Sequence, residues 1–216
     1  MYPPILEPLI NSPQLPQLLA RLNAYWQDEQ ARRQAFYDWV GPDIKAEFID
    51  GEIIVHSPVR SRHSTVLKYL VKLIDTYVEV HGLGYVGYES NMCRFPRNDY
   101  EPDLCFFDTA TATAINDTTT IFPVPQLIVE VLSASTKDRD RGVKFRDYQV
   151  NGVGEYWIVN ADTDVIEQYL LQNGVYRLAT KARPGDALRI PTLADWTVDA
   201  AVFFDAAANL RAVRAV

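Results

Sequence analysis

Two carboxylic acids stand at unusual places in the sequence and could together bind a cation. Glu130 interrupts the apolar run LIVEVL, which is typical of a buried strand, and Asp103 immediately precedes the apolar run LCFF. An ionised carboxylate on a packed face is costly unless it is paired or binds a metal ion. For either acid alone, a salt bridge or a strand end open to solvent is the ordinary explanation. Two carboxylates completed by waters and substrate oxygens, however, form the usual incomplete shell of Mg²⁺, provided that the two strands are neighbours.

A lysine further along the chain could complete such a site. In a helix over residues 138–150, Lys144 and Tyr148 are four residues apart and therefore share a face. A helix that follows the strand of Glu130 can pack back across the sheet and bring Lys144 to the ion. Considered alone, a lysine on a charged helix is usually solvated. The alternating signs of KDRDRGVKFRDY also favour local ion pairs over a basic nucleic-acid surface.

Other common site patterns are absent from the sequence or occur in the wrong context. GLGYVG has the G-x-G-x-x-G spacing of a dinucleotide fingerprint, but a helical pattern precedes it and a β-rich run follows, the reverse of what phosphate binding needs. The three histidines and two cysteines show no zinc spacing, and no serine stands in G-x-S-x-G. A glycosidase with two carboxylates would need aromatic-rich loops around the acids, which the sequence lacks.

The elements that must position these residues follow from periodicity and turn dipeptides. Residues 63–82 carry an apolar helical face, with Gly82 as the stop signal. Asp50-Gly51 and Asn173-Gly174 each predict a hairpin with a type I′ turn. Strands are expected in GYVGYESNMCRF, PDLCFFD, QLIVEVLS and EYWIVN, a loop in TATAINDTTTIFP, and a short strand with a closing helical turn in the tail. This order predicts a mixed sheet with helices on its faces.

The N-terminal part differs from the rest in composition. Residues 1–16 are rich in proline and are expected to be irregular, whereas residues 15–40 suggest one or two amphipathic helices with Leu18, Leu22 and Trp26 at helical spacing. With no internal repeat and no linker, we expect a single compact whole. It would consist of an N-terminal helical extension, residues 1–44, and a main domain, residues 45–216.

Composition and charge limit the class of protein. The chain of 216 residues is 48% hydrophobic and 23% charged, and no apolar run approaches the length of a membrane helix. The two cysteines fall in apolar stretches and are expected to be reduced, so a cytoplasmic location is expected. The net charge of −7 argues against a protein that grips duplex DNA over its whole surface, although a local basic groove remains compatible with it.

Taken together, the motifs resemble the PD-(D/E)XK nuclease superfamily and, in finer detail, its Uma-two family of endonucleases. The shared features run over about residues 45–205: an E-x-x-x-G-E hairpin beginning at Glu47, a histidine opening the long helix (His63), a PD strand, LIVEVLSAST, a K-x-x-x-Y helix and GVGEYWIVN. Most of the superfamily carries a lysine two positions after the second acid. Here that position is Leu132, and Lys144 fits the place to which several branches have moved the lysine.

The resemblance implies a restriction-endonuclease-like α/β (α+β) fold, in which helices flank a mixed central sheet and N-terminal helices and β-hairpins are added. It also implies an endonuclease that needs Mg²⁺ or Mn²⁺ and hydrolyses phosphodiester bonds of nucleic acid, DNA being favoured. Asp103, Glu130 and the backbone carbonyl of Val131 would then hold the ion.

The remaining roles are also implied by the resemblance. Lys144 would orient and help to deprotonate the attacking water and stabilise the charge on phosphorus. Glu47 and His63 would be accessory, as a further metal ligand or a proton-transfer partner.

Two further expectations concern partners. The acidic charge and the lack of a dense Lys/Arg run leave open a non-catalytic relative that keeps the fold as a binding or assembly module. A homodimer is expected if both strands of a duplex are cut, with the hairpin near Asn173 or the N-terminal helices as the contact.

Overall fold

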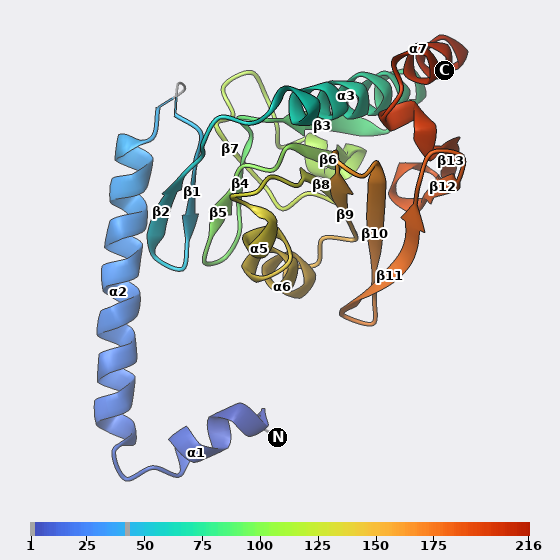
Figure 1. The fold of residues 1–216 in the computed structure, drawn as a ribbon. Helices are drawn as coiled ribbons and strands as arrows, with labels where there is room; N and C mark the ends of the chain where they lie inside the picture. The colour runs from blue at the N-terminus through green and yellow to red at the C-terminus, as the bar shows by residue number, and fades with distance from the viewer. Residues whose placement is uncertain (1–2, 42–43) are drawn as a thin grey trace.

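A mixed six-stranded sheet forms the centre of the molecule (Figure 1). The structure is a computed structural model, and it describes residues 3–41 and 44–216. In the sheet, β8 and β9 are parallel and the other neighbours are antiparallel. The order is β11-β10-β9-β8-β6-β3, with bounds β3 Gly84–Tyr88, β6 Leu104–Asp108, β8 Leu127–Val131, β9 Glu155–Asn160, β10 Val165–Gln172 and β11 Val175–Ala182. The expected mixed sheet flanked by helices is therefore confirmed.

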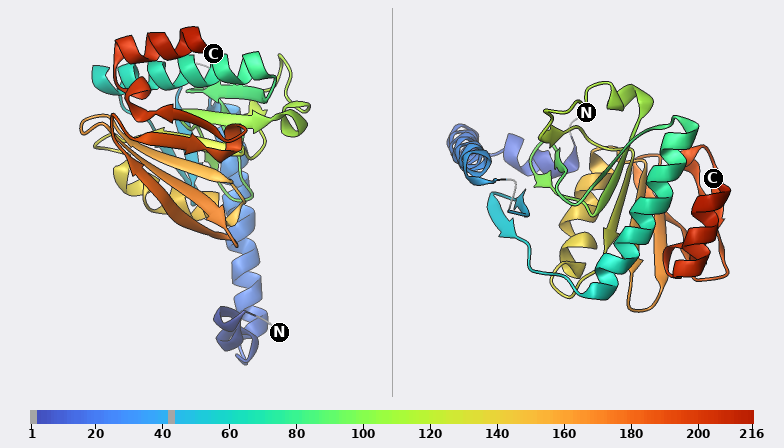
Figure 2. Two further views of the ribbon diagram at one scale, coloured as in Figure 1. Left: turned by 90° about the vertical axis from the view of Figure 1, so that its right-hand side faces the viewer. Right: turned by 90° about the horizontal axis from the view of Figure 1, so that it is seen from above.

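Helices cover both faces of this sheet (Figure 2). On one face lies α3 (Ser61–His81) with α7 (Ala206–Ala215) beside it, and on the other lie α5 (Lys137–Asp140) and α6 (Val143–Val150). Side chains alternate along β8, so that Val129 packs with the α3 core and Ile128 with the α6 core. Glu130 is two residues after Ile128, so its side chain lies on the same face of the sheet and points towards α6.

Two smaller sheets complete the strands. The first has the order β2-β1-β5-β4-β7, with bounds β1 Ala46–Ile49, β2 Glu52–Val55, β4 Met92–Arg94, β5 Asp99–Tyr100 and β7 Ile121–Phe122. The second pairs β12 (Ala187–Ile190) with β13 (Trp196–Asp199), near the short 3₁₀ helices η2 (Pro191–Leu193) and η3 (Ala200–Phe203). Both hairpin turns are confirmed, because Asp50-Gly51 and Asn173-Gly174 have positive φ at both positions, as a type I′ turn requires.

The helix predicted over residues 138–150 is wrong in one respect, because it is broken between α5 and α6. Gly142 stands at the break with φ −113° and ψ −100°, outside the helical region. A Cβ placed there would lie 2.6 Å from the carbonyl oxygen of Asp138. The chain thus approaches itself closely at this point, and α6 starts in a new direction.

Three other segments also differ from expectation. GYVGYESNMCRF forms two strands, β3 and β4, which belong to different sheets. The expected loop TATAINDTTTIFP contains the end of α4 (Thr109–Ala112) and the strand β7. The tail ends in a ten-residue helix, α7, rather than in a turn, and its strand has a partner. Each of these depends on pairing or packing with distant residues, which local pattern does not report.

The N-terminal segment extends away from the rest of the molecule (Figures 1 and 2). After η1 (Pro4–Leu6) and α1 (Glu7–Ile10), which fall where irregular chain was expected, α2 runs as one helix from Leu15 to Trp39. Its buried residues, Glu29, Arg33 and Phe36, all lie in its second half. We call residues 3–28 the arm; residues 1–2 and 42–43 of the expected extension lie outside the described residues.

Candidate active site

The two acids singled out in the sequence lie next to each other in the central sheet. Leu104 of β6 pairs with Val129 of β8 in an antiparallel register, which when continued places Asp103 beside Glu130. Asp103 also accepts a hydrogen bond at Oδ2 from the backbone N–H of Val131, over 2.8 Å. Asp103, Glu130 and Val131 all line one pocket of about 520 Å³. The two strands are thus neighbours, which is the condition for the acids to share one ion.

Asp103 is held as a carboxylate by positive neighbours. Its Oδ1 lies 3.2 Å from Nζ of Lys45 and 3.6 Å from Nε2 of His63, which opens α3 and also lines the pocket. Burial opposes ionisation, but His63, Lys45 and the N–H of Val131 outweigh it and hold the pKa of Asp103 well below its usual range. Asp103 is therefore charged at neutral pH.

Glu130 is in the opposite situation. Its Oε1 accepts hydrogen bonds from Nζ of Lys144 and from the hydroxyl of Tyr148, each over 2.9 Å. Within residues 3–41 and 44–216, its Oε2 has no hydrogen-bond donor. Burial raises the pKa of Glu130, and the charges of Asp140, Asp103 and Glu47 add to it against the effect of Lys144, so that the pKa reaches about 8. The site therefore holds more carboxyl groups than its cations can balance, and Glu130 keeps a proton at neutral pH unless further positive charge is bound.

Lys144 lies behind Glu130 rather than on the pocket wall. Its side chain is 1% exposed, and its Nζ is 2.8 Å from Oε1 of Glu47 and 3.6 Å from Oδ1 of Asp140. Burial would favour the neutral amine, but the carboxylates of Glu130, Glu47 and Asp140 raise the pKa of Lys144 well above its usual value. The lysine is a fixed ammonium group, and Tyr148, one turn further along α6, lies on the same face as expected.

Glu47 is the most deeply buried of the expected residues. It sits on β1, where it accepts the backbone N–H of Glu101 over 3.1 Å and lies 3.3 Å from Nε2 of His56. Burial opposes its ionisation, but Lys144 and His56 outweigh it and lower the pKa of Glu47 to about 2. Glu47 thus contacts Lys144, not the pocket.

Several residues of the site were missed by sequence reasoning. Asp140 has a usable signal, because Asp140, Lys144 and Tyr148 follow one another at intervals of four. Glu101, whose pKa is raised to about 7 chiefly by burial, stands two positions before Asp103 and could have been included with it. For Lys45 and His56 the sequence holds no comparable signal, since only the packing of the β1–β2 hairpin brings them in.

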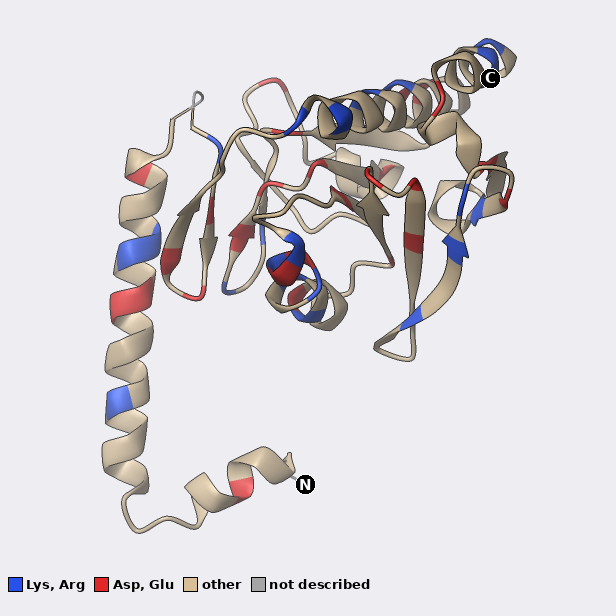
Figure 3. Ribbon diagram, viewed as in Figure 1, with Lys and Arg blue, Asp and Glu red and all other residues tan. Residues whose placement is uncertain are grey.

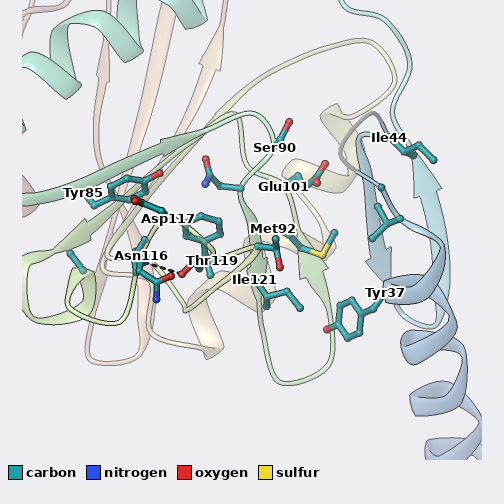
Figure 4. A pocket seen from close by; sticks show the side chains of 17 residues that line it. Tyr37, Ile44, Tyr85, Ser90, Met92, Glu101, Asn116, Asp117, Thr119 and Ile121 are labelled. Atoms are coloured by element: carbon teal, nitrogen blue, oxygen red, sulfur yellow. Dashed lines mark hydrogen bonds between the residues drawn. The ribbon is translucent and has the colours of Figure 1, made fainter.

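A second and larger pocket, of about 810 Å³, lies beside the end of α2 (Figure 4). Among the described residues that line it there is no lysine, arginine or histidine, and Glu101 and Asp117 contribute carboxyl groups. A phosphate would meet only repulsion from charged groups there. The smaller pocket, with its mixture of acids and bases, is therefore the candidate for phosphodiester chemistry.

The donor set of the smaller pocket fits a hard divalent cation. The carboxyl groups of Asp103 and Glu130 line the pocket, whereas those of Glu47 and Asp140 lie behind it around Lys144. Both carboxyl oxygens of Asp140 are buried and lack a hydrogen-bond partner within the described chain. No group of three or more His, Cys, Asp or Glu in the described ranges is arranged to hold an ion by itself. Oxygens of water or substrate would have to complete the shell, as is usual for Mg²⁺.

The chain is similar to a known protein family over most of its length. The sequence model of the Uma2 family, described as "Putative restriction endonuclease", matches residues 33–202. The chain belongs to the Uma2 family. No curated protein matches the chain.

The fold of this Uma2 member is shared with a solved structure. It is similar to the crystal structure of a putative nuclease belonging to DUF820 from Anabaena variabilis ATCC 29413, with a TM-score of 0.67 and 18% identity. The similarity covers 78% of this chain and 94% of that one. The structural similarity shows the fold, and the family supports a nuclease-like function. Among the helices that the structure describes, none is long and apolar enough to cross a bilayer.

Proposed function

We propose that this protein is a Mg²⁺-dependent endonuclease that hydrolyses phosphodiester bonds of DNA. The observation that carries the proposal is the pair Asp103 and Glu130, adjacent on β6 and β8 and facing one pocket, with a buried ammonium group behind them. Buried acids in excess of their cations are stable only when a further positive charge is bound or a proton is taken up. A divalent ion supplies that charge.

Each residue has a distinct task in this proposal. Asp103, Glu130 and the carbonyl of Val131 would hold the ion, which would supply Lewis-acid polarisation of the phosphate and activation of a water. Lys144 keeps its proton, because its pKa is raised. It therefore orients Glu130 and stabilises negative charge, and does not act as a base.

Glu47 and His63 take supporting tasks. Glu47 holds Lys144 in place through a contact of 2.8 Å. His63 lines the pocket beside Asp103, and its Nδ1 is buried without a hydrogen-bond partner in the described chain, so the ring has capacity for one more polar contact. We assign it to positioning Asp103.

The direct test is cleavage of plasmid DNA and of a structured RNA with Mg²⁺ or Mn²⁺ present. We expect nicking of DNA by the wild type and loss of at least 100-fold in rate for Asp103→Asn and Glu130→Gln, since each removes a charged ligand. Glu52→Gln, an exposed acid on β2, is the control that should retain full activity. Cleavage that survives in both site variants would overturn the proposal.

The alternative is a binding or assembly module that keeps the fold without catalysis. It is favoured by the net charge of −7. Metal linkage separates the two: an ion that binds only the folded state raises the melting temperature with its concentration. We expect millimolar Mg²⁺ to raise the melting temperature of the wild type and not that of Glu130→Gln. A wild type unaffected by Mg²⁺ and Mn²⁺ would favour the module.

We further propose a homodimer located in the cytoplasm. Cys93 and Cys105 are both buried and free, with Sγ atoms 4.0 Å apart, as suits a reducing compartment. A dimer would supply two sites for the two strands of a duplex. We assign the dimer contact to the arm.

A further inference from the structure

The candidate pocket does not end at the two acids. A second hollow, of about 440 Å³, adjoins it and shares part of its wall, namely Pro58, Val59, His63, Ser133 and Ser135. The two hollows therefore form one continuous groove, which we call the trench. It passes from Asp103 and Glu130 over the loop after β8 towards Lys137 and Asp162.

The charge within the trench poses a problem for a nucleic-acid strand. Asp103, Glu130 and Glu89 line it, and carboxylates repel phosphates. A strand can lie there only if other side chains supply positive charge, because phosphate contacts are made chiefly by Lys and Arg.

Most basic groups of the trench are already paired. Lys45 and His63 face Asp103, and His56 faces Glu47. At the far end, Arg60 lies 3.9 Å from Asp162. These groups already lie next to acids of the protein itself.

Two cations of the trench have no such partner. Arg139 lines the part next to the acids and Lys137 the adjoining part, and neither lies within 4.0 Å of a carboxylate oxygen in residues 3–41 and 44–216. Nε of Arg139 is buried and has no hydrogen-bond partner in that part of the chain. Desolvating a guanidinium N–H without an acceptor is costly, so a ligand that supplies an acceptor for this side chain would offset that cost. A phosphate oxygen is the acceptor that the fork of an arginine fits best.

Both residues are carried by α5, which is held by its own backbone. The N–H of Lys137 donates to the carbonyl of Ser133 over 3.2 Å, and the N–H of Arg139 to the carbonyl of Thr136 over 2.8 Å. Figure 3 shows basic and acidic residues interleaved on α5, and the buried one of the acids, Asp140, turns to Lys144 instead. The two basic side chains are thus left for the trench.

We propose that one strand of the nucleic acid lies along this trench, with Arg139 binding the phosphate next to the acids and Lys137 binding a neighbouring phosphate. The proposal rests on the proposed function for the identity of the ligand. Arg139 and Lys137 are positioning residues in it, and the acids perform the chemistry.

The test is binding of a fluorescent 16-mer, single-stranded and duplex, measured by anisotropy in EDTA between 50 and 200 mM salt. The logarithm of the binding constant falls linearly with the logarithm of the salt concentration. Losing one phosphate contact makes this negative slope less steep, by about 0.7 for a single strand and about 0.9 for a duplex. We expect Arg139→Gln and Lys137→Gln each to show such a decrease and to weaken binding at least threefold. Arg139→Lys should keep the slope. Arg177→Gln, an exposed arginine on β11 away from the trench, should match the wild type.

The outcomes separate this proposal from the nuclease itself. A melting temperature equal to that of the wild type shows that a variant is folded. If Arg139→Gln is unfolded, Arg139→Lys takes its place in the comparison. Altered binding without cleavage by any form would reject the nuclease and keep the trench. Cleavage by the wild type with unaltered slopes in both variants would reject the trench. No measurable binding by the wild type at 50 mM salt would also reject it.

Discussion

Glu130 is the residue at which the charge imbalance of the site becomes measurable. In the unfolded chain its pKa is near 4.5, whereas in the folded protein burial and nearby carboxylates raise the pKa to about 8. Between these values the folded state holds a proton that the unfolded state has lost. The free energy of unfolding therefore falls as pH rises through this window.

We accordingly expect the melting temperature of the metal-free protein to fall between pH 5 and pH 8. The fall should be shallower in Glu130→Gln, which cannot lose the proton. The pKa of Glu101 is raised to about 7, so this residue accounts for part of the fall that persists in Glu130→Gln. Scanning calorimetry at a series of pH values measures this, with Glu52→Gln as the matched exposed control. Equal slopes in wild type and Glu130→Gln would contradict the prediction.

Lys144 offers the second prediction at this scale. Its removal leaves Glu47, Glu130 and Asp140 without their shared cation, and breaking a buried ion pair from one side costs about 3–5 kcal/mol. We expect Lys144→Met to lower the free energy of unfolding in urea by about that amount at pH 8, and by less at pH 5, where the acids can take up protons. Lys72→Met, on the exposed face of α3, should change it by less than about 0.5 kcal/mol. An equal effect at both pH values would exclude the electrostatic explanation.

Among the elements, the break between α5 and α6 decides how the site is assembled. It allows α5 to carry Lys137 and Arg139 along the trench while α6 directs Lys144 beneath Glu130. One straight helix over residues 138–150 would instead hold Arg139 and Lys144 at a fixed rotation about a single axis. Gly142 permits the break, because any side chain there meets the carbonyl of Asp138 at 2.6 Å.

Substitution at this position tests the role of the break. We expect Gly142→Ala to destabilise the protein by about 1–3 kcal/mol, the usual cost of forcing extra atoms into packed structure. Gly154→Ala is the matched control, since its Cβ would meet its nearest atom at an ordinary 3.4 Å. Urea denaturation measures both. If Gly142→Ala is as stable as Gly154→Ala, the close approach does not constrain the chain.

At the scale of the whole molecule, the arm extends away from the packed domain (Figure 1) and exposes apolar side chains to solvent. It lies outside the residues matched by the family model, and in its helix Leu19, Leu22 and Trp26 are 50%, 55% and 43% exposed. These three recur at helical spacing and form one apolar stripe. Over residues 3–27 the only charged side chains are Glu7 and Arg21. We therefore propose that the stripe packs against the same stripe of a second copy, by two-fold packing of one arm on another.

The arm gives a prediction that distinguishes the two dimer contacts expected from the sequence. We expect the wild type to elute as a dimer at micromolar concentration and Leu19→Lys/Leu22→Lys to be monomeric, as measured by light scattering. The matched pair Val175→Lys/Leu178→Lys, on exposed positions of the β10–β11 hairpin, should remain dimeric. If only Val175→Lys/Leu178→Lys abolishes the dimer, the contact belongs to the hairpin instead. A monomeric wild type would contradict the proposed dimer altogether.

Much of the fold could be predicted because its signals are local. The apolar face of α3 and Gly82 at its end, with φ 62°, follow from helical periodicity and glycine's tolerance of left-handed backbone. The turns Asp50-Gly51 and Asn173-Gly174 follow from the φ values that a type I′ turn demands. By contrast, the division of GYVGYESNMCRF between two sheets depends on partners elsewhere in the chain.

The same division holds for the candidate site. Asp103 and Glu130 could be singled out from the sequence because an acid within an apolar strand must be compensated, whatever the surrounding fold. Only the tertiary structure decided how: Lys144 lies beneath Glu130 against Glu47, and Lys45 reaches Asp103. The physical reason is that side-chain ion pairs form across space between distant elements, and β1, β8 and α6 meet only after the sheets have packed.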